Sequence, residues 1–195
     1  MSLLGIDLGT TGSKAAAFSV DGRPLHSAYR EYPLIIAGPG LVEQNPDVVW
    51  EAVREVIRRV ASSHELRRDP VQALSISVSG DEAVPVDREG RCLTNCWLGM
   101  DRRGIDTLPF WRSVIDESHL FSVTGLPLTH IHPINRLLWL RENQPHVFAR
   151  VWKLLCWEEL IFYRMGIEPI TVWSFASRTL GFDLWRKRWS HEILS

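Results

Sequence analysis

The first part of the chain alternates apolar runs with short polar turns, which predicts a small β-sheet. Residues 3–8 form an apolar run that contains one carboxylate, Asp7, and residues 15–20 form a second apolar run. Glycines, hydroxyl residues and a lysine separate the two runs, so we predict a strand, a tight turn and a strand. Asp21-Gly22 follows as a hairpin turn.

The next segment predicts a third strand, a loop and an amphipathic helix. Residues 25–34 alternate well enough for a strand, and residues 35–41 contain Gly38-Pro39-Gly40, so we expect a loop there. Asn45-Pro46-Asp47 then provides a capping residue, a proline at the first helical position and an early acid. We expect this helix to end near Ser62. The apolar positions at helical spacing are Val49, Val53, Val56 and Val60.

A second strand-and-turn pattern follows the helix. Residues 71–78 read as a buried strand that runs into the polar turn Ser79-Gly80-Asp81-Glu82. Residues 83–86 predict another strand, and residues 92–97 continue the sheet edge. In open α/β folds, ligands gather beyond the carboxyl ends of strands. We therefore expect this turn and the one after residue 8 to face one cleft.

From Met100 the pattern becomes mainly helical. We predict helical regions over residues 101–117, from Pro133 to before Pro145, and over residues 154–165. Ser190 has the character of a helix cap, but the chain ends within the first turns of that helix. A helix without room for a few turns is marginal, so we expect a truncated fragment.

Bulk properties restrict the class of protein. The 195 residues are 45% hydrophobic and 23% charged, as in a soluble globular protein. The net charge of −1 provides no basic field for nucleic acid or an anionic membrane. No apolar run is long enough to span a bilayer and no signal peptide is evident, so we predict a cytoplasmic location. The three cysteines lack metal-binding spacing and fit packed thiols in a reducing compartment.

The turn after residue 8 has the chemistry of a phosphate cradle. Gly9 and Gly12 lack a Cβ, so the backbone can bend sharply and a phosphate can approach its N–H groups. Asp7, at the end of the strand, is placed to hold a hydrated Mg²⁺. The side-chain donors of the turn are Thr10, Thr11, Ser13 and Lys14.

Two better-known phosphate loops are excluded. The GxxxxGK[ST] loop requires a hydroxyl residue after its lysine, whereas Lys14 is followed by Ala15, and no Gly-x-Gly is present for GxGxxG. Both of those loops also lead into a helix, whereas this turn leads into a strand. A phosphate turn between antiparallel strands indicates an actin-like, ribonuclease H-like nucleotide-binding fold, with an ordinary glycine-rich hairpin as the alternative.

Blocks of residues in a fixed order carry a resemblance to a known family. They are Gly5 to Lys14, Val42-Glu43-Gln44-Asn45-Pro46 with Trp50, Ser79-Gly80-Asp81-Glu82, Trp97 to Arg103, Thr124-Gly125-Leu126 and Ala176-Ser177-Arg178-Thr179. In this order the chain resembles the N-terminal part of the FGGY carbohydrate kinases, the family of glycerol kinase, xylulokinase and gluconokinase. The resemblance covers essentially the whole chain, although residues 97–103 contain extra residues between the tryptophan and the aspartate.

The resemblance implies an α/β, ribonuclease H-like (actin-like ATPase) domain with a mixed sheet and flanking helices. It also implies ATP-dependent phosphorylation of a hydroxyl on a small, xylulose-like sugar or polyol, with ATP and Mg²⁺ as cofactors. By position, Asp7 is the catalytic carboxylate that holds Mg²⁺ through water. The implied phosphate-binding residues are Thr10, Thr11, Gly12, Ser13 and Lys14. The implied substrate-binding residues are Gly80, Asp81, Glu82, Asp101 and Arg103.

The chain departs from the family pattern in two respects. Gly80-Asp81 stands where glycerol kinase has Arg-Glu and xylulokinases have Met-His, so the substrate is left open. Family members are more than twice as long, and their catalytic aspartate lies in a Gly-Asp turn that has no counterpart here. We therefore expect residues 1–195 to form an N-terminal domain, with a core over 1–100 and a helical elaboration over 101–195. The general base and the C-terminal domain would be absent.

These expectations leave alternatives for the function and the partners. The leading hypothesis is one half of a sugar kinase that is inactive alone. A non-catalytic, stand-alone sugar- or nucleotide-binding module is the alternative, and another actin-like ATPase is a weaker one. Expected partners are a small sugar or polyol, the missing C-terminal domain and a second copy in a homodimer. Two further clusters, His130 with His132 and Glu158 with Glu159, fit loop packing and the first turn of a helix better than metal binding or catalysis.

Overall fold

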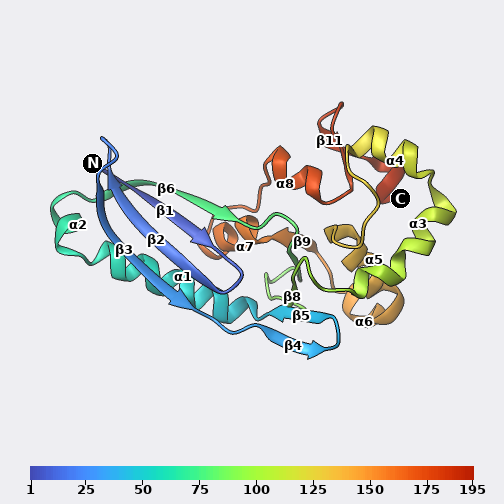
Figure 1. The fold of residues 1–195 in the computed structure, drawn as a ribbon, viewed down its shortest axis with the longest axis horizontal. Helices are drawn as coiled ribbons and strands as arrows, with labels where there is room; N and C mark the ends of the chain where they lie inside the picture. The colour runs from blue at the N-terminus through green and yellow to red at the C-terminus, as the bar shows by residue number, and fades with distance from the viewer. The chain divides into compact units, whose positions relative to one another are not determined.

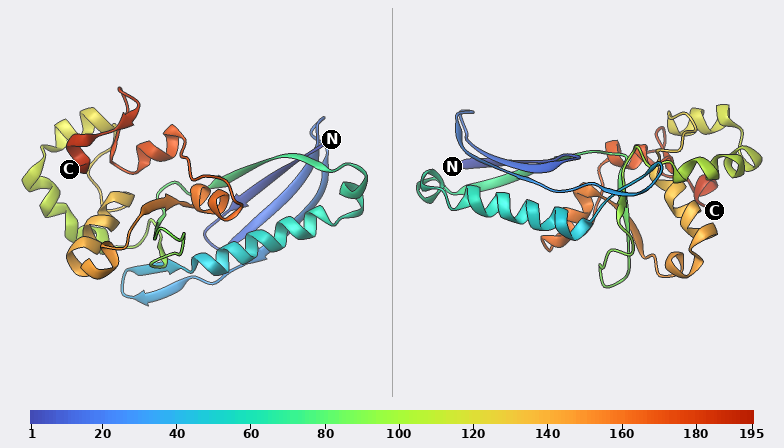
Figure 2. Two further views of the ribbon diagram at one scale, coloured as in Figure 1. Left: turned by 180° about the vertical axis from the view of Figure 1, so that it is seen from behind. Right: turned by 60° about the horizontal axis from the view of Figure 1, so that its bottom comes forward.

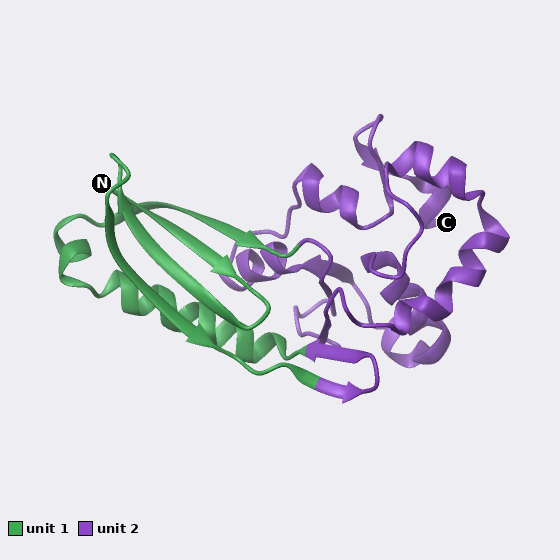
Figure 3. Cartoon of the chain, viewed as in Figure 1, with its two compact units in different colours: residues 1–35, 44–79 green, residues 36–43, 80–195 purple.

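The computed structural model describes residues 1–195, which separate into two compact units (Figure 3). Unit 1 contains residues 1–35 and 44–79, and unit 2 contains residues 36–43 and 80–195. Each unit is therefore assembled from two stretches of sequence. None of the helices combines the length and the apolar character that a bilayer crossing requires.

Unit 1 is built on a four-stranded mixed sheet in the order β3-β2-β1-β6 (Figure 1). β1 pairs antiparallel with β2 and parallel with β6, and β2 pairs antiparallel with β3. The predicted strand, turn and strand are confirmed. The third strand is shorter than predicted, because Tyr32 leaves the ladder and its N–H donates to the carbonyl of Thr11 at 3.1 Å. The strands are β1 (Ser2–Leu8), β2 (Gly12–Ser19), β3 (Pro24–Glu31) and β6 (Val71–Val78).

The helix α1 (Pro46–Ala61) covers one face of this sheet (Figure 2). It begins where predicted, since the side chain of Asn45 accepts hydrogen bonds from the N–H groups of Asp47 at 2.9 Å and Val48 at 3.3 Å. A short helix, α2 (His64–Arg68), follows. The four predicted apolar positions of α1 are at most 1% exposed and pack with alternate residues of the strands. The buried strand positions include Leu4, Ile6, Leu8, Ala15 and Ala17.

Unit 2 contains a five-stranded sheet in the order β4-β5-β8-β7-β9. Its strand β7 pairs antiparallel with both β8 and β9 and is buried along its whole length. The strand β4 begins at the last residue of the first stretch of unit 1, and β5 ends at the first residue of the second. The strands are β4 (Ile35–Gly38), β5 (Leu41–Gln44), β7 (Ala83–Val86), β8 (Cys96–Trp97) and β9 (Lys153–Cys156).

Two predictions for this part of the chain are wrong. The expected loop over 35–41 is mostly a hairpin, in which Pro39 and Gly40, at a φ of +73°, form the tight turn between β4 and β5. The expected helix over 154–165 begins later, because residues up to Cys156 pair with β7. An apolar run of this length fits a buried strand as well as a helix, so its pattern alone does not separate them.

Helices surround a second apolar core in unit 2. A two-stranded hairpin, β10 (Phe182–Asp183) with β11 (Arg188–Trp189), lies in the same unit. The helices are η1 (Arg103–Thr107), α3 (Leu108–Val114), α4 (Glu117–Thr124), α5 (Pro133–Asn143), α6 (Pro145–Phe148), α7 (Trp157–Arg164), α8 (Trp173–Arg178) and α9 (His191–Leu194). The core consists of Trp111, Leu120, Leu128, Ile134, Leu138, Leu180 and Ile193.

Candidate functional site

In unit 1, the turn between β1 and β2 places one acid and one base side by side. Asp7 lies directly opposite Lys14 in the antiparallel ladder and beside Ser77 of the parallel strand β6. All three residues are exposed, on the sheet face that α1 does not cover. Opposed residues of an antiparallel pair have Cβ atoms about 5 Å apart. Asp7 and Lys14 nevertheless form no ion pair with any residue of the chain, so both charges face solvent.

The carbonyl groups of this turn are held within unit 1. The Tyr32 hydroxyl donates to the carbonyl of Gly9 at 2.6 Å, and the Tyr32 N–H donates to that of Thr11. The amide of Gln44 donates to the carbonyl of Thr10 at 2.6 Å. The N–H groups of Thr10 and Thr11 donate to no protein atom. The turn therefore presents two unpaired amides and two exposed hydroxyls to solvent, as an anion-binding backbone nest does.

Ser13 corrects one expectation, because its side chain faces inward. The residue is fully buried, and its hydroxyl lies 3.4 Å from the hydroxyl of Tyr32. Burial raises the pKa of Tyr32 to about 12, and the protonated phenol donates to the carbonyl of Gly9. Ser13 thus belongs to the support of the turn and not to its outward-facing donors.

In unit 2, the turn that follows β6 carries a two-point ion pair. The guanidinium of Arg178, at the end of α8, donates through Nε to Asp81 Oδ1 at 2.8 Å and through Nη2 to Asp81 Oδ2 at 2.6 Å. The side chain of Arg178 is 45% exposed and that of Asp81 is 19% exposed. The charges are paired, yet both groups retain a solvent-facing edge.

The residues on either side of Asp81 are more enclosed. A Cβ at Gly80 would lie 3.2 Å from Arg178 Cδ and from the ring of Phe175, a tighter contact than is usual, so the absence of a side chain here eases the approach of α8. Glu82 is buried, and its Oε1 accepts a hydrogen bond from the Gly99 N–H at 3.3 Å. Its other oxygen has no partner in the chain. Glu82 is therefore less accessible to a ligand than Asp81.

Asp101 and Arg103 lie in the same unit but are already engaged. Asp101 Oδ1 accepts from Arg103 Nε at 2.9 Å, and Asp101 Oδ2 accepts from the Val42 N–H at 2.9 Å. Arg103 Nη2 also donates to Asp101 Oδ2 and to Glu43 Oε1, at 2.6 Å each. The guanidinium carbon lies 3.9 Å from the ring centroid of Trp97. Burial alone would raise the pKa of Asp101, but the hydrogen bonds from Arg103 and Val42 bring it below its ordinary value.

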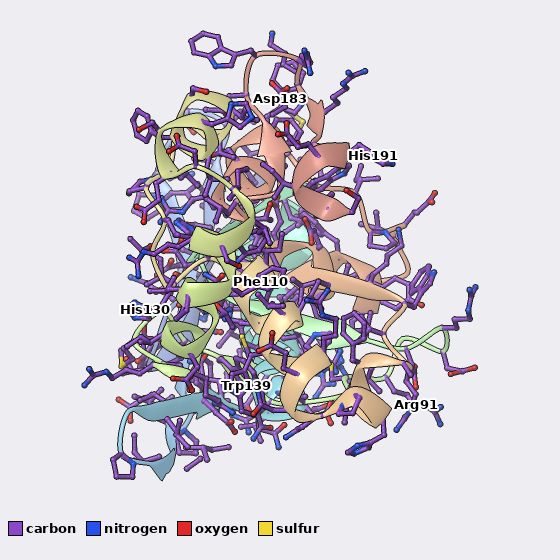
Figure 4. The ribbon with its side chains drawn as sticks, turned by 90° about the vertical axis from the view of Figure 1, so that its right-hand side faces the viewer. Arg91, Phe110, His130, Trp139, Asp183 and His191 are labelled. Atoms are coloured by element: carbon purple, nitrogen blue, oxygen red, sulfur yellow. The ribbon has the colours of Figure 1, made fainter.

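This network joins several of the sequence blocks described above. Trp139 of α5 (Figure 4) stands edge-on to Trp97, with ring centroids 5.0 Å apart and an interplanar angle of 85°. Glu43 Oε2 accepts a hydrogen bond from the Asn95 amide at 2.8 Å. Since the two acids and Arg103 are almost fully enclosed, this geometry favours a positioning role over direct contact with a ligand.

In each of the two other polar clusters, one residue has structural partners, namely His132 in the first and Glu159 in the second. Both ring nitrogens of His132 face backbone carbonyls, Nδ1 that of Arg178 at 3.1 Å and Nε2 that of Pro127 at 2.9 Å, whereas His130 lies in the turn before α5 (Figure 4). Glu159 Oε2 accepts a hydrogen bond from the Cys156 N–H at 2.8 Å and so closes the first turn of α7. No group of three or more His, Cys, Asp or Glu side chains in the chain is arranged to hold a metal ion.

Comparison with models of protein families identifies the family of this chain. The model of the N-terminal domain of the FGGY family of carbohydrate kinases matches residues 2–195. The chain belongs to this family.

The relatives of this FGGY domain are named for different substrates. The gluconokinase of Bacillus subtilis (strain 168) is 26% identical over 98% of this chain, and the glycerol kinase of Koribacter versatilis (strain Ellin345) is 30% identical over 98%. The xylulose kinase structure from Rhodospirillum rubrum superimposes with a TM-score of 0.93 at 20% identity over the whole chain. The actin-like α/β fold predicted from the sequence is confirmed. The chain spans 37% of the length of that gluconokinase, and 40% of that of each of the other two proteins.

The structure distributes the predicted FGGY site residues over its two units. It brings Asp7 together with Lys14 and the threonine turn in unit 1, and it groups Asp81, Glu82 and Gly80 with α8 in unit 2. Sequence reasoning missed three side chains that shape these places: Tyr32, Gln44 and Arg178. The last two lie within blocks that carried the resemblance, but their partners are distant in sequence and only the tertiary structure identifies them.

Proposed function

We propose that this FGGY domain is the sugar- and phosphate-binding half of an ATP-dependent kinase that phosphorylates a hydroxyl of a small sugar or polyol. The observation that carries the proposal is the turn over residues 9–12. Its carbonyls are engaged, the N–H groups of Thr10 and Thr11 are free, and it lies between an unpaired acid and an unpaired lysine. Phosphoryl transfer depends mainly on such positioning and on neutralisation of charge.

Each group of the turn has a defined part in the proposed reaction. The amides and hydroxyls of Thr10 and Thr11 bind phosphate oxygens, and Lys14 adds a positive charge. Gly12 leaves the space beside the turn that the side chain of Tyr29 occupies. Asp7 lies at the end of β1 beside them and is free of ion pairs, which suits a Mg²⁺ held through water. That Mg²⁺ would neutralise charge on the phosphates.

The turn over residues 80–82 binds the substrate in this proposal. Asp81 accepts hydrogen bonds from substrate hydroxyls, while Glu82, Asp101 and Arg103 keep the surrounding backbone in place. A general base for the attacking hydroxyl is not among the residues described. We infer that it comes from a further domain, since the relatives are more than twice as long as this chain. The homodimer and the cytoplasmic location stay predictions.

A substitution at Lys14 tests the phosphate-binding part of the proposal. Lys14→Ala should weaken the binding of Mg·ATP to the 195-residue chain about tenfold, because a charge-assisted contact is lost. Arg23→Ala is the matched control, since it removes a cation from the opposite end of the same hairpin. Calorimetric titration of the three proteins provides the comparison. Equal affinity in all three would contradict the proposal.

A turnover assay tests the inferred division of labour. The isolated chain should release little or no ADP in a coupled assay over pentuloses, hexonates and polyols. Turnover near that of full-length relatives would show that residues 1–195 contain their own general base, and the proposed need for a second domain would be wrong.

A further inference from the structure

Arg178 stands at the substrate turn of unit 2, although no motif assigned it to the site. It reaches Asp81 from 97 positions further along the chain and holds both carboxylate oxygens. A pairing of this kind fixes the plane of both groups, because the guanidinium and the carboxylate form two parallel hydrogen bonds. The Asp81–Arg178 pair therefore presents a rigid row of polar groups, which we call the polar edge.

Both members of the pair retain unused hydrogen-bonding capacity. A guanidinium has five N–H donors and a carboxylate accepts about four hydrogen bonds, and the pairing uses two of each. Nη1 of Arg178 donates to no protein atom, and 45% of the Arg178 side chain is exposed. The edge thus offers N–H donors next to carboxylate lone pairs. Two neighbouring hydroxyls of one ligand, one accepting and one donating, match this arrangement.

The surroundings hold Arg178 in position from two sides. Gly80 leaves the space into which the Arg178 side chain packs, with the ring of Phe175 beside it. The backbone carbonyl of Arg178 lies 3.1 Å from Nδ1 of His132, which is 3% exposed and whose Nε2 lies 3.2 Å from the Thr129 hydroxyl. A preorganised donor of this kind costs little conformational entropy when a ligand binds.

The charges on the pair bear on the kind of ligand it accepts. Asp81 neutralises the guanidinium, and the buried Glu82 follows it directly in the chain. A carboxylate ligand would have to displace Asp81 from Arg178 or approach its oxygens against charge repulsion. A neutral diol meets neither obstacle.

We propose that Arg178 is a substrate-contacting residue, and that the Asp81–Arg178 pair selects neutral sugars or polyols with adjacent hydroxyls over sugar acids. This inference rests on the function proposed above and narrows its substrate class. A ligand that lacks one of the two hydroxyls leaves a donor or an acceptor unpaired, which is how such sites discriminate.

Binding of three probes to the 195-residue chain tests the inference: xylitol, D-gluconate and 1,5-pentanediol, which has no adjacent hydroxyls. Measured by NMR titration, xylitol should bind at least about tenfold more tightly than either of the others. Arg178→Gln should weaken xylitol binding about tenfold, and Arg178→Lys, which keeps the charge but loses the fork, should weaken it less. Asp81→Asn frees the guanidinium and should shift the preference toward gluconate by at least about tenfold.

The control is Arg112→Gln, which removes an exposed arginine paired with Glu117 at 2.8 Å on α3 and should leave all three affinities unchanged. If Arg178→Gln folds normally and binds xylitol like the unsubstituted chain, or if gluconate binds better than xylitol, the inference is wrong while the proposed kinase function stands. If the unsubstituted chain binds neither a sugar probe nor Mg·ATP, the proposed function fails and this inference fails with it.

Discussion

At the scale of single residues, Tyr32 shows how a buried side chain shapes a turn to which it does not belong. Its hydroxyl and its N–H engage two of the three carbonyls that the β1–β2 turn would otherwise present. The exposed surface of the turn consequently consists of donors. The same hydroxyl accepts a hydrogen bond from the buried Ser13 hydroxyl, which has no other hydrogen-bond partner in the unit.

The raised pKa of Tyr32 predicts a loss of stability at high pH. The unfolded chain ionises this phenol near pH 10, whereas the folded chain holds the proton to about pH 12. The contribution is fully present below about pH 10, and the free energy of unfolding should fall as the pH rises from about 10 to about 12. Tyr32→Phe should remove this part of the fall, and at neutral pH it should cost about 1 kcal/mol for the lost hydrogen bond.

Urea unfolding at pH 9 and pH 11 provides the measurement. Tyr163→Phe is the matched control, because Tyr163 lies on α7 in unit 2 and should leave the pH dependence unchanged. Parallel pH profiles for Tyr32→Phe and the unsubstituted chain would contradict the argument.

At the scale of elements, the helices differ in how their first turns are satisfied. α1 has a side-chain cap at Asn45, a proline in its first turn and an apolar face that is almost fully buried. Ser63 precedes α2 but its side chain makes no cap hydrogen bond. A cap stabilises a helix only where its oxygen reaches a free N–H group, so similar residue types contribute differently at these two places.

Alanine substitutions at Asn45 and Ser63 should differ in their effect on the free energy of unfolding. Asn45→Ala should lower the free energy of unfolding by about 1 kcal/mol, since two N–H groups of α1 lose their acceptor. Ser63→Ala should change it by less than about 0.5 kcal/mol. Chemical denaturation of both variants, followed by circular dichroism, provides the test, and equal losses would show that the cap geometry is unimportant.

At the scale of the whole molecule, the tryptophans and cysteines are distributed unevenly between the two units. Of the nine tryptophans only Trp50 lies in unit 1, and all three cysteines lie in unit 2. Intrinsic fluorescence and thiol chemistry therefore report mainly on the sheet and helices of unit 2. The three cysteines form no disulfide.

Thiol labelling should follow the burial of the three cysteines. Cys96 and Cys156 are 0% and 3% exposed, and burial raises the pKa of both thiols. Only the thiolate reacts readily, so these two should stay unlabelled in the folded chain at pH 8, while Cys92, which is partly exposed, should react. Mass spectrometry after labelling counts the modified sites. Labelling of all three thiols before unfolding would contradict the packing of β8 and β9.

The sequence predicted those features that depend on neighbours along the chain. The β1–β2 turn, the cap at Asn45 and the valine face of α1 each follow from spacing or local chemistry. The placement of Ser13 among the outward-facing donors is wrong, although the alternation of residues along β2 predicts its burial. Adjacent residues of a strand point to opposite faces, so Ser13 and Lys14 do not both face outward. The Asp81–Arg178 pair could not be predicted, because no local sequence pattern indicates a contact between residues 97 positions apart.

The close approach of α8 to Gly80 has a consequence for how this site changes in evolution or in the laboratory. A larger residue at position 80 would crowd an arginine at position 178, since a single added carbon would lie 3.2 Å from the arginine and would require it to shift. The two positions are therefore expected to be epistatic. Exchanging the turn alone would crowd the arginine, whereas losing the arginine alone would leave Asp81 unpaired. A graft of substrate preference from a relative must carry both segments together.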